Sequence, residues 1–172
     1  MPARSRASAY ADRAAASGLG LLADAAILQK LKRRANSTFD VQAAEARMIQ
    51  DLLPYQRDFA TDFDHKYVGF CGGYGSGKTY TLVVKQLLLC FRSQGFTHLF
   101  LEPTIPLIDD VALPTWNLIL EKYSIPHTFR VSPRPVFKLL LPDGETPILL
   151  RSMENYERLI GVNAASIASD ET

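Results

Sequence analysis

The residues with the clearest chemistry form a glycine-rich stretch before the middle of the chain. It matches the pattern G-x-x-x-x-G-K-[ST] at every position: Gly72, Gly73, Tyr74, Gly75, Ser76, Gly77, Lys78 and Thr79. Glycines let successive backbone N–H groups face one centre, and a helix that follows adds partial positive charge there. Such a loop favours a polyphosphate. Lys78 would reach the outer phosphates, and the Thr79 hydroxyl would ligate Mg²⁺.

A chance glycine-rich turn is the alternative explanation of this stretch. With ordinary residue usage the pattern should arise at about 4 in 100,000 positions, so under about 1% for a chain of this size. The flanks argue against chance as well. Residues 67–71 have the apolar and aromatic composition of a strand, and residues 81–92 have the length and apolar content of a buried helix. The sequence therefore predicts strand, phosphate loop and helix in that order.

Two adjacent acids, Asp170 and Glu171, follow the small apolar residues 164–169. That run is typical of a buried strand, which would deliver the acids at its C-terminal end. Asp170 would hold Mg²⁺ directly or through water, and Glu171 would orient and deprotonate an attacking water. In isolation the pair is better explained as an acidic end on a frayed tail. Together with the phosphate loop, the acids favour an ATPase that uses ATP and Mg²⁺.

A further candidate lies upstream of the predicted first strand, at Gln56. Its side-chain amide can both donate to and accept from the edge of adenine, with Tyr55 or Phe59 as a stacking surface. An ordinary exposed helix residue is an equally good explanation of Gln56.

Composition places these motifs in one domain. The chain has 172 residues, 47% of them hydrophobic and 22% charged, which is enough for one globular core. We expect a helical or partly disordered N-terminal extension over residues 1–39 and a P-loop ATPase domain over residues 40–172. The net charge of +1 predicts no global basic field. The one dense basic cluster, at residues 30–34, is either a solvated helix end or a contact for DNA or a partner.

Other features exclude several classes of protein. Two cysteines, Cys71 and Cys90, can build neither a zinc set nor a disulfide framework, and they indicate apolar packing in a reducing compartment. The longest apolar runs are too short to span a bilayer. The isolated histidines are expected to be core or surface residues rather than metal ligands.

The remaining pattern predicts an α/β fold. Helices are expected over residues 23–34, 40–53 and, interrupted near Pro114, 107–123; strands are expected over 97–102, 129–132, 136–141 and 148–151, with a turn at 142–145. The predicted fold class is a P-loop NTPase with a central, largely parallel sheet flanked by helices and preceded by the helical extension.

The order of these segments resembles the ATPase domain of the large terminase subunit of tailed bacteriophages. The resemblance covers about residues 50–172 and is carried by residues 53–56, the phosphate loop, residues 102–104 after a strand, and residues 157–161 shortly before the acids. It implies a motor that uses ATP to translocate double-stranded DNA into a viral capsid. The motor would work as a homo-oligomeric ring with a portal protein and a small terminase subunit, in the cytoplasm of the infected host cell.

The chain departs from that family in two respects. Many members carry an arginine finger within the phosphate loop, where this chain has Tyr74. We then expect Arg158 to supply the charge, reaching the ATP of a neighbouring subunit, with Arg151 as second choice and a surface salt bridge as the alternative role of Arg158. The sequence also stops before the strand that senses γ-phosphate and before the nuclease carboxylates. The expectation is a fragment or a split subunit with weak or absent ATPase activity of its own and no nuclease site.

Two other functions are compatible with the sequence. One is a different P-loop enzyme, either a helicase-like translocase or a small-molecule kinase. The kinase is disfavoured by the long gap between Lys78 and Asp170 and by the lack of an arginine-rich lid. The other is a non-catalytic, nucleotide-binding assembly module.

Overall fold

The structure, a computed structural model, describes residues 39–170, apart from the side chains of Asn155, Tyr156 and Arg158. The predicted extension lies outside the described residues, except for Phe39. Glu171 lies outside them as well, so its predicted role is not tested by the structure.

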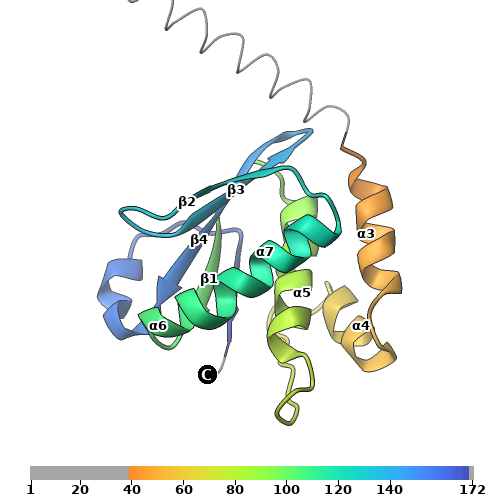
Figure 1. The fold of residues 1–172 in the computed structure, drawn as a ribbon, viewed down its shortest axis with the longest axis horizontal. Coiled ribbons are helices and arrows are strands. Elements are labelled where there is room, and N and C mark those ends of the chain that lie inside the picture. The colour runs from red at the N-terminus through yellow and green to blue at the C-terminus, as the bar shows by residue number, and fades with distance from the viewer. Residues whose placement is uncertain (1–38, 171–172) are drawn as a thin grey trace, which may run out of the picture. The chain divides into compact units, whose positions relative to one another are not determined.

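A five-stranded sheet with the order β2-β3-β4-β1-β5 forms the centre of the described fold (Figure 1). Its strands are β1 (His98–Glu102), β2 (His127–Arg130), β3 (Val136–Leu141), β4 (Gly144–Ser152) and β5 (Ser166–Ser169). β1 pairs in parallel with both β4 and β5, whereas β2 with β3 and β3 with β4 are antiparallel.

The α/β class is therefore confirmed, but the prediction of a largely parallel sheet is wrong. The sheet is mixed, with parallel pairing confined to one side. The reason is the short turn at Pro142 and Asp143, which joins β3 directly to β4. Such a tight connection can only link antiparallel strands, since parallel neighbours need a long crossover.

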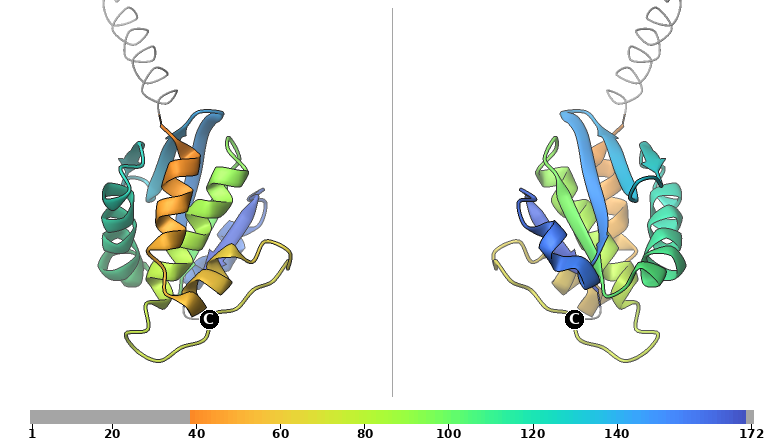
Figure 2. Two further views of the ribbon diagram at one scale, coloured as in Figure 1. Left: turned by 90° about the vertical axis from the view of Figure 1, so that its right-hand side faces the viewer. Right: turned by 90° about the vertical axis from the view of Figure 1, so that its left-hand side faces the viewer.

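The helices comprise α3 (Val41–Gln50), α4 (Pro54–Thr61), α5 (Lys78–Arg92), α6 (Ile105–Leu107), the π-helical turn η1 (Ile108–Ala112), α7 (Leu113–Lys122) and the 3₁₀ segment η2 (Met153–Leu159). The predicted interruption near Pro114 is confirmed, because η1 ends and α7 begins there. α7 lies beside α5, as the views in Figures 1 and 2 agree. None of the helices in residues 39–170 is long and apolar enough to cross a bilayer.

The core lies between the helices and one face of the sheet. Phe100 of β1 is in register with Leu150 of β4 and Ala168 of β5, so these three side chains point to the same face. Trp116 of α7 packs edge-on against Phe100, with ring centroids 5.6 Å apart, and stacks on Phe137 of β3 at 5.7 Å. The bulky aromatic side chains fix the distance of α7 from the sheet.

The predicted first strand, residues 67–71, is not a strand. The segment runs outside the sheet, and Tyr67 is 85% exposed. Its main attachment is Phe70, which stacks on Tyr55 at 6.0 Å and contacts Phe59 at 5.1 Å, both residues of α4. The composition is that of a strand, but a strand also needs a neighbouring strand to share its hydrogen bonds. Among the described strands, none pairs with this segment.

Candidate phosphate-binding site

The second half of the glycine loop turns directly into α5. Gly75 and Gly77 have φ angles of 74° and 76°, in the left-handed region that costs an L-residue about 1–2 kcal/mol. Gly77 is the N-cap, and its carbonyl accepts from Thr81 N at 2.9 Å. The first turn of a helix leaves N–H groups without intrahelical acceptors. Those of the turn beginning at Lys78 therefore adjoin the loop, where an anion would find them.

Lys78 lies within the curl of the loop. Its Nζ donates to the carbonyl oxygens of Gly72 and Gly73, each at 3.1 Å. These bonds bring the first half of the loop around the ammonium group, while Tyr74 stands fully exposed at the tip. The positive charge is thus placed against the backbone carbonyls at the start of the loop.

Gln56 supports the loop through a hydrogen bond to its backbone. Its Nε2 donates to Ser76 O at 3.3 Å, and its Oε1 accepts from Leu53 N at 3.1 Å, capping the start of α4. The side chain is 8% exposed. A Cβ atom on Gly77 would lie only 2.8 Å from Gln56 Nε2, so an alanine there would displace the Gln56 amide from the loop. The predicted contact of Gln56 with adenine stays a prediction. In the structure, the side-chain amide of Gln56 binds the loop backbone.

Asp170, which follows β5, contacts the phosphate loop although the two lie far apart in the sequence. Asp170 N donates to Leu101 O at 3.0 Å, which continues the β1–β5 ladder by one residue. At this C-terminal end of β5, Asp170 Oδ2 accepts from the Thr79 hydroxyl at 2.5 Å, across 91 positions of sequence. Asp170 is 5% exposed. The structure therefore brings together the carboxylate, the hydroxyl and the lysine that the sequence singles out.

These groups fit a magnesium–polyphosphate complex. Mg²⁺ is commonly held by one or two protein oxygens with phosphate and water completing its shell, and Thr79 and Asp170 offer one oxygen-bearing group each. No cluster of three or more His, Cys, Asp or Glu side chains competes for a metal within the described residues. The hydroxyl of Ser76 is buried and has no hydrogen-bond partner within residues 39–170. A buried hydroxyl without a partner costs about 1–3 kcal/mol, which a phosphate oxygen would offset.

A second polar network, which the sequence does not indicate, fixes α5 against the sheet. His98 Nδ1 lies 2.7 Å from Ser166 Oγ, and Gln86 Nε2 of α5 donates to the same hydroxyl at 2.9 Å. Burial lowers the pKa of His98, partly opposed by its backbone contact with Ser93, so the ring is neutral at pH 7. The prediction that His98 is a core histidine fits this position. Its partner Ser166 could not have been found without the register of β1 and β5.

The two predicted arginine fingers belong to elements other than the phosphate loop and β5. Arg151 lies on β4, which β1 separates from β5, so the two strands are about 10 Å apart. The backbone of Arg158 lies in η2, and its side chain is among those not described. Both remain predictions for an assembly of several subunits.

No protein-family model, no curated protein and no solved structure matches the chain. Similarity therefore assigns neither family nor function, and the geometry around Lys78, Thr79 and Asp170 carries the functional proposal.

Proposed function

We propose that the protein is a P-loop ATPase that binds Mg–ATP between residues 72–79 and Asp170 and drives translocation of double-stranded DNA into a viral capsid. The observation that supports ATP binding is the contact between the Thr79 hydroxyl and Asp170 Oδ2, beside a loop that surrounds Lys78 Nζ. Such a contact between a carboxylate after β5 and a hydroxyl at the start of α5 supports a shared magnesium site.

The chain's own groups divide the work between binding and orientation. Loop amides and Lys78 neutralise phosphate charge, and Ser76 offers a buried hydroxyl to the same ligand. Thr79 and Asp170 would hold Mg²⁺, which when bound supplies charge neutralisation to the phosphates. Their hydrogen bond keeps both oxygens in place beforehand. Gln56 keeps the loop backbone in its curled form through Ser76 O.

Hydrolysis needs two further groups in this proposal. Glu171 directly follows Asp170 and would orient and deprotonate water. Arg158, or Arg151 as second choice, would supply late positive charge from a neighbouring subunit of a homo-oligomeric ring. The role as a packaging motor is supported by the resemblance to large terminase subunits. The portal protein, the small terminase subunit and the cytoplasm of the infected cell belong to the same proposal.

One observation favours a second candidate, the nucleotide-binding assembly module. Residues 67–71 lie outside the sheet, so the first half of the loop lacks the strand that would brace it. A loop of this kind suits nucleotide-dependent ordering without rapid turnover. A helicase-like translocase or a kinase remains the alternative within the P-loop enzymes.

Separate measurements of nucleotide binding and turnover test the proposal. Fluorescent ATP should bind the full chain only with Mg²⁺ present. Asp170→Asn should weaken this binding at least about tenfold, because it removes the carboxylate's charge. Asp143→Asn is the matched control, since Asp143 lies in the exposed β3–β4 turn. Equal loss in both variants, or no binding by the unmodified chain, would refute the ATP site.

Turnover then separates the candidate functions. Hydrolysis stimulated by duplex DNA, portal and capsid indicates the motor, whereas duplex-independent phosphoryl transfer to a small molecule indicates a kinase. Tight binding of Mg–ATP without turnover under all these conditions indicates the assembly module.

A further inference from the structure

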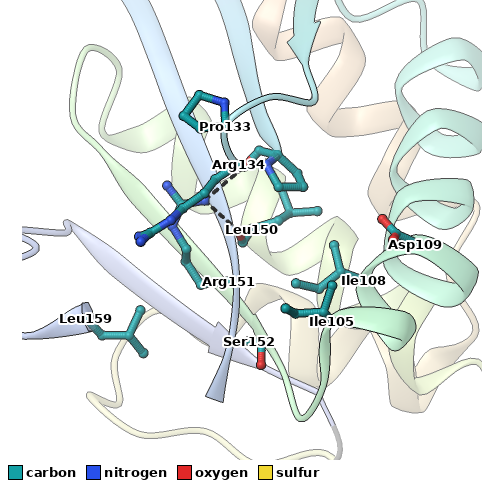
Figure 3. A pocket seen from close by; sticks show the side chains of 10 residues that line it. Ile105, Ile108, Asp109, Pro133, Arg134, Leu150, Arg151, Ser152 and Leu159 are labelled. Atoms are coloured by element: carbon teal, nitrogen blue, oxygen red, sulfur yellow. Dashed lines mark hydrogen bonds between the residues drawn. The ribbon is translucent and has the colours of Figure 1, made fainter. Parts of the chain in front are cut away.

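Three arginines gather around β2 and β4, away from the phosphate loop. Arg130 ends β2, Arg134 lies in the segment between β2 and β3, and Arg151 lies on β4. Arg134 and Arg151 line a cavity of about 180 Å³ (Figure 3). Ile105 and Ile108 form an apolar wall on the other side.

The deepest of the three guanidinium groups is held in a fixed orientation. Arg151 Nη1 donates to Pro135 O at 3.0 Å and to Leu150 O at 2.6 Å. Arg151 is half-buried, whereas Arg130 and Arg134 are exposed, and of these two Arg134 lines the cavity while Arg130 ends β2 outside it. The cluster therefore combines two solvent-exposed arginines with one half-buried arginine whose guanidinium group is held in place.

The positive charge of this cluster is not neutralised within the described chain. Burial lowers the pKa of Arg151 most, and repulsion from Arg134 and Arg130 lowers it further, although a guanidinium stays charged at neutral pH. None of the three forms a salt bridge to a carboxylate of residues 39–170. Asp109 also lines the cavity, but Figure 3 shows it on the helical side, away from Arg151.

We propose that Arg130, Arg134 and Arg151 form a second phosphate site, which takes the phosphodiester backbone of a polynucleotide. Guanidinium groups match phosphate geometry with paired N–H donors. One exposed arginine at the cavity and a second outside it suit a polyanion that continues beyond the cavity, and the apolar wall suits the sugar next to a bound phosphate. The choice of a polynucleotide rests on the proposed motor function, whereas the affinity for phosphate does not.

The site is distinct from the ATP site of the same chain. Arg151 is in register with Leu101 of β1, while Ser152 is in register with Glu102, so Arg151 points to the opposite face of the sheet from Ser152. Asp170 follows Ser169, which is also in register with Leu101. By the same alternation, Asp170 and Arg151 lie on opposite faces.

Binding of a fluorescent DNA duplex to the full chain, without nucleotide, tests the site by anisotropy at several salt concentrations. We expect Arg134→Gln and Arg130→Gln each to weaken binding about three- to tenfold and to lower the salt dependence by about one ion. Both side chains are exposed, so the variants should fold. Lys138→Gln is the matched control, because Lys138 lies on the adjacent β3 but is paired with Glu145 at 3.4 Å. Unchanged affinity in both arginine variants, or an equal loss in Lys138→Gln, would overturn the proposal.

Competition identifies the source of the phosphate. Unlabelled duplex should displace the probe, whereas inorganic phosphate and ATP should do so only at far higher concentration. Displacement by ATP at the same concentration as duplex nucleotides would overturn the polynucleotide as ligand. Arginine-dependent duplex binding by a chain that fails to bind Mg–ATP would leave this site standing while the ATP site falls. If the chain binds Mg–ATP but its duplex binding does not depend on the arginines, the ATP site stands and this second phosphate site falls.

Discussion

The segment of residues 67–79, which contains the glycine loop, has two halves that are held in very different ways. From Gly75 onward, the backbone is fixed by the start of α5, by Gln56 through Ser76 O, and by the bond between Thr79 and Asp170. Before Gly75, the chain from residue 67 to Tyr74 is largely exposed and lies outside the sheet. Phe70 is its principal contact with α4. We call these the anchored half, residues 75–79, and the open half, residues 67–74.

The difference shows which structural feature each half needs. A helix satisfies its backbone groups locally, so α5 forms wherever its apolar face can pack. A strand obtains its hydrogen bonds from another strand, and the open half pairs with none of the described strands, so it lies outside the sheet. Lys78 connects the two, because its ammonium group binds the carbonyls of Gly72 and Gly73. A ligand that competes for Lys78 therefore acts on the open half first.

The largest expected effect is in thiol reactivity, because each region carries one cysteine. Cys71 is exposed in the open half, whereas Cys90 of α5 is fully buried and burial raises the pKa of its thiol. Cys90 reacts only after unfolding, so its rate with a disulfide reagent should be slower by a factor on the order of 1,000 or more. Absorbance of the released thiolate gives both rates.

Cys71→Ser should remove the fast phase and leave the slow one. If Cys71 reacts as slowly as Cys90, the open half is paired and the comparison fails. Added Mg–ATP should slow the labelling of Cys71 without changing that of Cys90, because phosphates drawn to Lys78 would reorder the open half. An unchanged Cys71 rate at saturating Mg–ATP would mean that the ligand does not order this segment.

The next effect concerns the charge that both halves share. Lys78→Ala removes the ammonium group, and we expect Mg–ATP affinity, or turnover where measurable, to fall by a factor on the order of 100. The matched control is Lys66→Ala, since Lys66 is exposed just before the open half and its Nζ lies over the Tyr67 ring, 5.4 Å from the centroid. A similar loss in both variants would indicate a general charge effect rather than a phosphate contact.

Sequence reasoning succeeded here where the physics is local or strongly patterned. Most of α5, the break near Pro114 and the place of the β3–β4 turn could be predicted from composition and turn chemistry. α5 begins three residues before the predicted helix, and the turn is confined to Pro142 and Asp143 because β4 begins at Gly144. The meeting of Asp170 with Thr79 could be expected only because the two motifs make chemical sense together. Pairing was not predictable in the same way. The composition of residues 67–71 is that of a strand, yet no rule of composition says whether a partner edge is present.

The glycines allow the two halves to be compared within one loop. Gly77→Ala places an L-residue at φ 76° and a Cβ atom 2.8 Å from Gln56 Nε2. We expect the free energy of unfolding to fall by about 1–2 kcal/mol. At Gly73, an added Cβ atom meets nothing within 4 Å, so Gly73→Ala should change it by less than about 0.5 kcal/mol. Urea unfolding of both variants measures the difference, and equal costs would show that the open half is as constrained as the anchored half.

The smallest effect tests the network that holds α5 and the anchored half against the sheet. Because burial lowers the pKa of His98 below its ordinary 6.5, the unfolded chain binds up to one more proton than the folded chain as the pH falls from about 6.5 toward the folded-state pKa. Stability from His98 is therefore present above that pH and is lost as the pH drops toward the folded-state pKa. The slope from one proton is at most about 1.4 kcal/mol per pH unit.

His98→Gln keeps a polar group near Ser166 Oγ but cannot titrate. Urea unfolding between pH 5 and pH 7 should then show a shallower pH dependence in His98→Gln than in the unmodified chain. The control is His65→Gln, because His65 is exposed and is paired with Asp62 at 2.9 Å. This variant should leave the contribution of His98 intact. Identical pH profiles for the His98 variant and the unmodified chain would mean that protonation of His98 does not loosen the sheet from α5.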